Sequence, residues 1–155
     1  MTRLPALGPR GEGWVAGQFT LFAAILLAAF AGGTWSGSAD VPAGLASIGV
    51  GVLLVGWAAA GLGSAVTPFP APRADADLAT GGVYALARHP MYGGVLLCAF
   101  GWSLAFASAL GLALTAVLAV CLDLKSRREE AWLSARPGYA AYRARTRRRF
   151  VPYLY

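Results

Sequence analysis

Long apolar runs, separated by short polar stretches, dominate the pattern along the chain. Two runs, at residues 14–33 and 44–66, each hold about 20 residues. At about 1.5 Å of helical rise per residue, that length crosses the roughly 30 Å of hydrocarbon in a bilayer. A third stretch, from Met91 to Leu122, has 32 residues and no charged side chain. It is too long for one span, so we expect a tight hairpin that turns near residues 107–111.

The pattern predicts an all-α integral membrane protein that forms a single membrane domain over residues 1–155. Its four transmembrane helices are expected at about residues 14–33, 44–66, 91–107 and 110–124. Residues 123–136 should continue the fourth helix out of the membrane, until Pro137-Gly138 interrupts it. Residues 139–149 are then expected to form a basic, amphipathic C-terminal helical extension. The proline-rich stretch 67–82 should lie along the membrane surface.

Composition supports the membrane assignment. The chain is 57% hydrophobic and only 13% charged, with a mean hydropathy of +0.58. A soluble domain of 155 residues buries too small a fraction of its surface to hide that much apolar area. The net charge of +6 sits on basic residues that flank the apolar runs, so anionic lipid headgroups are expected as partners rather than nucleic acid. One histidine and two dispersed cysteines do not favour a metal site.

The distribution of charge predicts the orientation. With four spans, all 13 Lys and Arg residues and six of the seven acidic residues fall on one side, which gives 13 − 6 = +7. The other side holds only Asp40, at −1, and the two sides sum to +6. By the positive-inside rule, both termini should be cytoplasmic, in a multi-pass protein of the cell inner membrane or plasma membrane.

Candidate chemistry begins at Arg88-His89-Pro90, directly before the third span. Pro90 fits the first position of a helix, which puts the only histidine, His89, at or near the N-cap. The free N–H groups that follow would attract an anion, and Gly93-Gly94 would let a ligand approach the backbone. An interfacial belt that anchors a helix end explains the same residues equally well.

A second polar cluster follows the fourth span. Asp123, Arg127 and Glu130 have the spacing of one helix face, and Lys125 and Glu129 form a pair on an adjacent face. Ordinary pairing within the helix explains part of this pattern. Carboxylates at the mouth of an apolar hairpin would also suit an aminated or hydroxylated ligand. The later cluster of arginines, by contrast, is interpreted as a lipid-headgroup patch. Its members are Arg143, Arg145, Arg147, Arg148 and Arg149.

Two blocks of residues in the second half of the chain resemble a known signature. The first reads Leu78-x-x-x-Gly82-x-Tyr84-x-x-x-Arg88-His89-Pro90-x-Tyr92-x-Gly94. The second reads Glu129-Glu130-x-x-Leu133, then Gly138-Tyr139-x-x-Tyr142-Arg143, then Val151-Pro152. Together they resemble the isoprenylcysteine carboxyl methyltransferase and phospholipid methyltransferase superfamily, as a short, bacterial-type member. The resemblance covers residues 67–155, which would form the cofactor-binding part.

The resemblance implies an integral-membrane methyltransferase that uses S-adenosylmethionine at the cytoplasmic end of the final hairpin. The cofactor-binding residues that it implies are Tyr84, His89, Tyr92 and Gly94 on one side, and Glu129 and Glu130 on the other. Arg88 and Arg143 would be catalytic, by orienting an acidic acceptor or the cofactor carboxylate. The acceptor would be small or lipophilic: a carboxylate, a thiol or a lipid amine. The alternative is a non-enzymatic four-span protein, such as a small transporter or assembly factor, that has retained the scaffold.

Overall fold

The computed structural model describes residues 5, 7–31, 33–37, 40–71 and 77–150. Its α-helices are α1 (Glu12–Ala28), α2 (Asp40–Leu62), α3 (Pro90–Ala105), α4 (Ala109–Leu133) and α5 (Tyr139–Arg145). Three short 3-10 turns accompany them: η1 (Ala29–Ala31), η2 (Gly63–Ala65) and η3 (Gly82–Ala85). No strand occurs among these residues, which confirms the all-α prediction for the part of the chain described.

Three of the helical segments are long and apolar enough to cross a membrane: Glu12–Ala31, Asp40–Ala65 and Ala109–Leu133. The fourth apolar helix, α3, is shorter, at 16 residues. Large apolar side chains on these helices face outward, and Leu53 and Phe30 are 74% and 77% exposed. Water would make such exposure unfavourable, whereas lipid tails would not. The helices therefore present the surface of a membrane protein.

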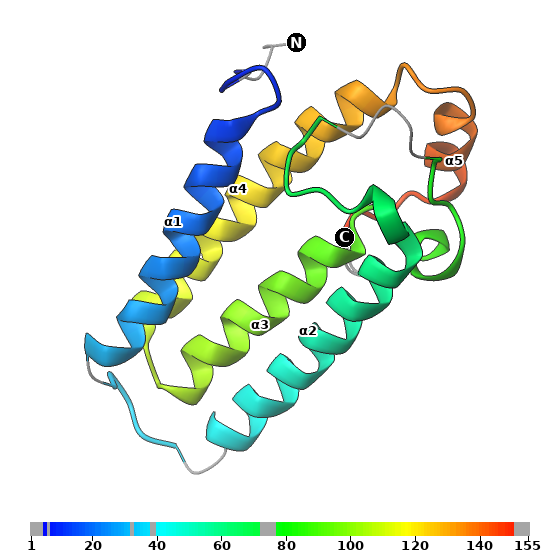
Figure 1. Ribbon diagram of the computed structural model, residues 1–155. Coiled ribbons are helices and arrows are strands. Elements are labelled where there is room, and N and C mark those ends of the chain that lie inside the picture. Colours follow the sequence, from blue (N-terminus) through cyan, green and yellow to red (C-terminus); the bar gives the residue numbers. More distant parts are fainter. Residues whose placement is uncertain (1–4, 6, 32, 38–39, 72–76, 151–155) are drawn as a thin grey trace.

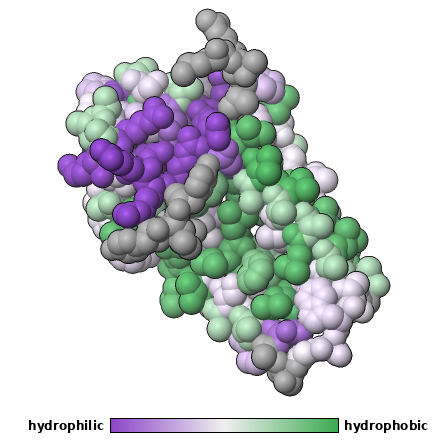
Figure 2. Space-filling model, turned by 180° about the vertical axis from the view of Figure 1, so that it is seen from behind, coloured by the Kyte–Doolittle hydropathy of each residue, from purple (hydrophilic) through white to green (hydrophobic). Residues whose placement is uncertain are grey.

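The four long helices alternate in direction, so that the start of α1, the end of α2, the start of α3 and the end of α4 lie at one end of the molecule (Figure 1). The charged segments gather at that end, together with α5. Figure 2 shows hydrophilic side chains concentrated there, above a broad hydrophobic surface. This separation matches the one-sided charge expected from the sequence.

Helices α2 and α3 pack closely because glycines remove the side chains between them. A Cβ atom on Gly51 would lie 2.6 Å from the carbonyl oxygen of Gly94, and one on Gly44 would lie 2.5 Å from that of Gly101. Small residues allow helix backbones to approach in this way in membranes. Gly49, on another face of α2, has no atom within 4 Å of its Cβ position. The glycines at the interface thus bring the start of α3 beside the end of α2.

The turn between α3 and α4 occurs where the sequence predicts it. Ala107 adopts a left-handed φ of 48°, and the Ser108 hydroxyl accepts a 3.1 Å hydrogen bond from the amide of Gly111 to cap α4. The same hydroxyl donates to the carbonyl of Ala28 in α1, at 3.1 Å. The hairpin is therefore fastened to α1 at the end opposite to the charged cluster.

The start of α2 differs from the prediction. The sequence predicts a loop through Pro42 and a helix from residue 44, but α2 begins at Asp40. Proline is tolerated in the first turn of a helix, because the N–H that it lacks would have no partner there. The Asp40 carboxylate also accepts a 2.7 Å hydrogen bond from Trp35 Nε1, which holds the connection against the helix start.

After α5, the chain runs back across the start of α3. The amide of Arg88 donates to the carbonyl of Arg148 at 3.0 Å, and the amide of His89 donates to that of Arg149 at 2.7 Å. We call residues 146–150 the C-terminal strap. It places arginine side chains and carbonyl groups beside the polar residues at the head of α3.

Candidate active site

The C-terminal strap packs against one side of the head of α3. His89 is the N-cap and Pro90 the first helical residue, as the sequence predicts. The amides of Tyr92 and Gly93, however, donate to the His89 carbonyl at 3.1 and 3.5 Å. The Phe150 carbonyl fills the space beside Gly93 that a Cβ would occupy. The prediction that Gly93-Gly94 would let a ligand approach the backbone is therefore wrong, because the C-terminal strap fills the space beside Gly93 and α2 fills that beside Gly94.

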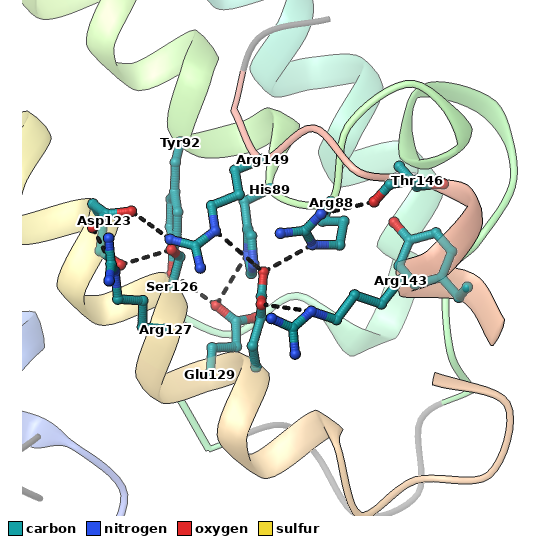
Figure 3. A network of polar contacts seen from close by, with 12 residues as sticks. Arg88, His89, Tyr92, Asp123, Ser126, Arg127, Glu129, Arg143, Thr146 and Arg149 are labelled. Carbon is teal, nitrogen blue, oxygen red and sulfur yellow. Dashed lines mark hydrogen bonds and ion pairs between the residues drawn. The ribbon is translucent and has the colours of Figure 1, made fainter. Parts of the chain in front are cut away.

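Glu130 is the centre of the polar network. Its Oε1 accepts a 2.8 Å hydrogen bond from Arg88 Nε and a 3.2 Å hydrogen bond from His89 Nε2. All three residues are buried, at 4%, 8% and 6% exposure for Glu130, Arg88 and His89. The apolar part of α4 ends at Leu122, so Glu130 lies in its charged last turns. Figure 3 shows Arg88, His89, Arg143 and Arg149 converging on this part of α4.

The charge state of Glu130 follows from these contacts. Burial raises the pKa of its carboxyl, but the hydrogen bonds from His89 and Arg88 outweigh burial and bring the pKa to about 2. Glu130 is therefore a carboxylate that holds two side chains of the α3 head in fixed positions. Arg88 is fixed from the other side as well, since its Nη1 donates to the carbonyls of Thr146 and Arg147 at 2.7 and 2.6 Å.

Glu129, the neighbour of Glu130, is more accessible. Its side chain is 26% exposed, and its Oε2 accepts a 3.0 Å hydrogen bond from the Tyr92 hydroxyl. His89 Nδ1 lies 3.6 Å from the same oxygen. The rings of His89 and Tyr92 stack, with centroids 5.5 Å apart and planes inclined by 4°. Lys125 Nζ lies 5.3 Å from the centre of the Tyr92 ring. Glu129 thus has both a fixed orientation and access to solvent.

A cavity of about 110 Å³ opens beside these residues. Its apolar wall comes from Leu62, Ala65, Leu78, Ala79, Met91 and Leu133. Its polar side chains include Tyr84, Arg88, His89, Tyr92, Glu129, Arg136 and Tyr139. The cavity therefore combines an apolar surface with a few converging polar groups, which is the usual character of small-molecule sites.

The tyrosines of this wall are held from two directions. The Tyr84 hydroxyl donates to the carbonyl of Ala58 in α2 at 3.3 Å, and the Tyr142 hydroxyl donates to the Tyr84 carbonyl at 2.8 Å. Burial raises the pKa of Tyr84 and brings that of Tyr142 to about 12, so both phenols stay protonated. Helix α5 is thereby joined to η3 and α2 around the cavity.

Five of the eight predicted site residues line this cavity: Tyr84, Arg88, His89, Tyr92 and Glu129. Glu130 lies behind them, in contact with Arg88 and His89. Arg143 is 56% exposed, with its Nε 3.6 Å from Glu130 Oε2, and lines a separate surface depression with Arg147. Gly94 faces α2, where a Cβ would meet the Gly51 carbonyl at 2.7 Å. The sequence signature thus combines residues of the cavity with residues that pack helices.

Arg149 was missed by the sequence interpretation. Its Nη1 donates to Asp123 Oδ1 at 2.5 Å, its Nε lies 3.7 Å from Glu130 Oε1, and its side chain is only 16% exposed. The assignment of Arg149 to a lipid-headgroup patch is wrong. Arg147 and Arg148, its neighbours, are exposed, and nothing in the spacing distinguishes the three. The Val151-Pro152 end of the signature lies outside the described residues.

A comparison with known families places the chain among them. The family model for phospholipid methyltransferase matches residues 40–138, which cover α2, α3 and α4. No curated protein and no solved structure matches the chain. Helix α1 and the C-terminal strap lie outside the matched range. The match covers more than half of the chain, and we conclude that the protein belongs to the phospholipid methyltransferase family, whose members are membrane methyltransferases.

Proposed function

We propose that the protein transfers the methyl group of S-adenosylmethionine to a lipophilic or small acceptor at the cytoplasmic face of the membrane. In this proposal α3 is a fourth span, shortened to about 24 Å at 1.5 Å per residue. It runs between the same two ends of the molecule as α1, α2 and α4 (Figure 1). The observation that carries the proposal is the cavity between Glu129, Tyr92 and Tyr84 at the charged end.

The residues of the cavity fit such a cofactor. A sulfonium nucleoside offers an ammonium, hydroxyls, a carboxylate and an apolar ring, and the cavity offers a carboxylate, phenols, an arginine and an apolar wall. Its volume of about 110 Å³ is below the roughly 300–1,000 Å³ typical of small-molecule sites. Binding must therefore move some side chains of the wall outward.

The two glutamates take different roles in this proposal. Glu129, exposed to the cavity and oriented by Tyr92, would hold the ammonium or the ribose hydroxyls of the cofactor. Glu130 has its Oε1 engaged by Arg88 and His89 and is buried, so it would act as a positioning residue. It keeps His89 against Tyr92 and so keeps Tyr92 against Glu129.

The two arginines are also unlike. Arg88 directs its Nε to Glu130 and its Nη1 to two carbonyls, so its main effect is to hold the α3 head and the C-terminal strap together. Arg143 is exposed at the outer edge of the network. It lines a separate depression and not the cavity, so it would meet an acidic acceptor or the cofactor carboxylate only if its exposed side chain turned toward the cavity.

The proposed reaction does not require a dedicated group to transfer a proton. The cofactor supplies an electrophilic methyl group on a sulfonium, and an in-line displacement depends on the orientation of two reactants and the exclusion of water. A carboxylate or thiolate acceptor is already nucleophilic. What the chain contributes is a fixed wall of His89, Tyr92 and Glu129 next to an apolar surface.

An apolar groove supports a lipophilic acceptor. It measures about 490 Å³ and lies between α1, α2 and α3, below the polar end. Phe22 and Ile25 of α1 line it together with Val52 and Val55 of α2. Along α3, its residue Val95 follows Tyr92 by three positions, close to one helical turn. An acyl or prenyl chain in this groove would bring its polar head toward the cavity.

Transfer of labelled methyl tests the proposal. Purified protein, reconstituted with a lipid extract, is incubated with S-adenosylmethionine labelled in its methyl group. We expect label in the organic phase, and a sharp reduction with Glu129→Gln, which keeps shape and removes charge. Separate incubations with small carboxylic acids and thiols detect a small acceptor. Absence of transfer to lipid, acid and thiol alike would favour the non-enzymatic alternative.

A further inference from the structure

Tyr139 presents a buried hydroxyl that bonds to nothing in the described part of the chain. The residue is 2% exposed, and its hydroxyl oxygen is inaccessible to solvent and has no hydrogen-bond partner there. It begins α5 and lines the same cavity as Glu129 and Tyr92. An unpartnered buried hydroxyl weakens a fold, because it gives up its bonds to water without replacement. A buried polar group without a partner calls for an explanation, and in a cavity wall a bound ligand would supply one.

Tyr142, one helical turn later, provides the contrast within the same helix. It is also buried and lines the cavity, but its hydroxyl donates to the Tyr84 carbonyl at 2.8 Å. One phenol of α5 therefore completes a hydrogen bond within the protein, and the other has no partner among the described residues. Packing alone accounts for both rings, whose centroids are 6.0 Å apart, but it does not account for the Tyr139 hydroxyl.

The surroundings of Tyr139 make it a donor. Burial raises the pKa of its hydroxyl well above the ordinary value, so the phenol keeps its proton. Arg136, three residues earlier, lines the same cavity, as do the carboxylates Asp77 and Glu129. A group that accepts hydrogen bonds, such as a carboxylate oxygen, a hydroxyl oxygen or a ring nitrogen, would suit this position.

We propose that the Tyr139 hydroxyl is a cofactor-binding group, which donates a hydrogen bond to an acceptor atom of the bound methyl donor. The proposal rests on the proposed function and adds to it a residue on α5, opposite the head of α3. The hydroxyl would complete its hydrogen bonding only when the donor is bound. Binding would thus remove an unfavourable feature of the ligand-free protein.

Two matched variants test this role without measuring turnover. Tyr139→Phe and Tyr142→Phe each remove one oxygen from neighbouring positions of one helix. Thermal unfolding of the ligand-free proteins in detergent gives stability, and calorimetric titration with S-adenosylhomocysteine gives Kd. For Tyr139→Phe we expect an unchanged or higher Tm and a Kd weakened about three- to tenfold, the effect of one neutral hydrogen bond. For Tyr142→Phe we expect a lower Tm and a smaller change in Kd.

The outcomes separate this proposal from the function on which it rests. If the unaltered protein binds neither S-adenosylhomocysteine nor S-adenosylmethionine, the proposed function fails. If the unaltered protein binds and Tyr139→Phe binds equally well, only the role of Tyr139 fails. A ligand-free Tm for Tyr139→Phe as low as that of Tyr142→Phe, or a failure to fold, would also overturn it, because the hydroxyl would then have a partner in the protein.

Discussion

Arg149 Nη1 donates a 2.5 Å hydrogen bond to Asp123 Oδ1 and so ties the C-terminal strap to the point where α4 leaves its apolar stretch. Asp123 Oδ2 also accepts a 2.7 Å hydrogen bond from Nε of Arg127, which lies on the same helix. The strap in turn supplies the carbonyls that hold Arg88. The integrity of the cavity wall therefore depends on a segment that lies outside the family match.

Arg149→Ala should destabilise the protein. It removes a charge-assisted hydrogen bond at a partly buried site, worth about 1.5–3 kcal/mol. Thermal unfolding in detergent measures the loss. Arg145→Ala is the matched control, because Arg145 is exposed on the outer face of α5. If both substitutions had equal, small effects, Arg149 would again be interpreted as part of the lipid-headgroup patch.

Substitution of Glu130 should mainly lower the stability of the fold, whereas substitution of Glu129 should mainly weaken ligand binding. Glu130→Gln leaves Arg88 buried without its counter-charge, and we expect a loss of about 3 kcal/mol or more in unfolding free energy. Glu129→Gln keeps an oxygen that accepts from Tyr92, so stability should change little while S-adenosylhomocysteine binding weakens. Thermal unfolding and titration with S-adenosylhomocysteine, applied to both variants, test these two roles. Stability loss in Glu129→Gln with none in Glu130→Gln would reverse the assignment.

Acidification should weaken the hydrogen bonds around Glu130 over a defined pH range. The folded-state pKa of Glu130 is about 2, below its ordinary value of 4.5, so the stability that the carboxylate contributes is complete above about 4.5. It is lost as the pH falls from there through about 2. We expect the Tm of the unaltered protein to fall more steeply over this window than that of Glu130→Gln. Parallel slopes would show that other carboxyls dominate acid unfolding.

Lys125 and Gln18 should behave as a coupled pair. Lys125 is 1% exposed, and its Nζ donates to Gln18 Oε1 at 2.5 Å, which joins α4 to α1. Gln18→Leu leaves a buried ammonium without this acceptor and should cost about 1.5–3 kcal/mol. The double variant Gln18→Leu with Lys125→Met should recover part of that loss, because the charge is gone. Strictly additive changes in unfolding free energy would exclude the coupling.

Glycines of α2 provide a matched test of helix packing. Gly51→Ala places a Cβ about 2.6 Å from Cys98 Sγ and the Gly94 carbonyl, so α2 must move away from α3. Gly49→Ala meets no atom within 4 Å and should be neutral or stabilising, by up to about 1 kcal/mol. Thermal unfolding ranks the two. If alanine were tolerated at Gly51 as well as at Gly49, the close contact between α2 and α3 at Gly51 would be contradicted.

The sequence predicted those features that depend on local pattern. The apolar runs predicted the helices, Pro90 predicted the start of α3, and the length of the 91–122 run predicted the hairpin turn. The residues quoted around His89 and Glu129 do meet across one cavity. These signals are local because helix starts and apolar lengths are decided by neighbouring residues.

Long-range partners were not predictable in the same way. Arg149 and Arg148 are neighbours of the same residue type, and they differ in the direction in which the C-terminal strap points their side chains. Sequence spacing does not predict that direction. Gly94 belongs to the same short block as His89 but faces α2, because five positions at about 100° each turn it roughly 140° away around the helix. The sequence also could not show that, among the described residues, the Tyr142 hydroxyl has a partner and the Tyr139 hydroxyl has none.

Binding of S-adenosylhomocysteine to the purified protein in detergent tests the central claim most directly. Thermal unfolding over a ligand series should show a Tm that rises with concentration, as expected for a ligand that binds only the folded protein with a micromolar Kd. Glu129→Gln should shift the same curve to higher ligand concentration. No rise in Tm at millimolar ligand, with either S-adenosylhomocysteine or S-adenosylmethionine, would contradict the account.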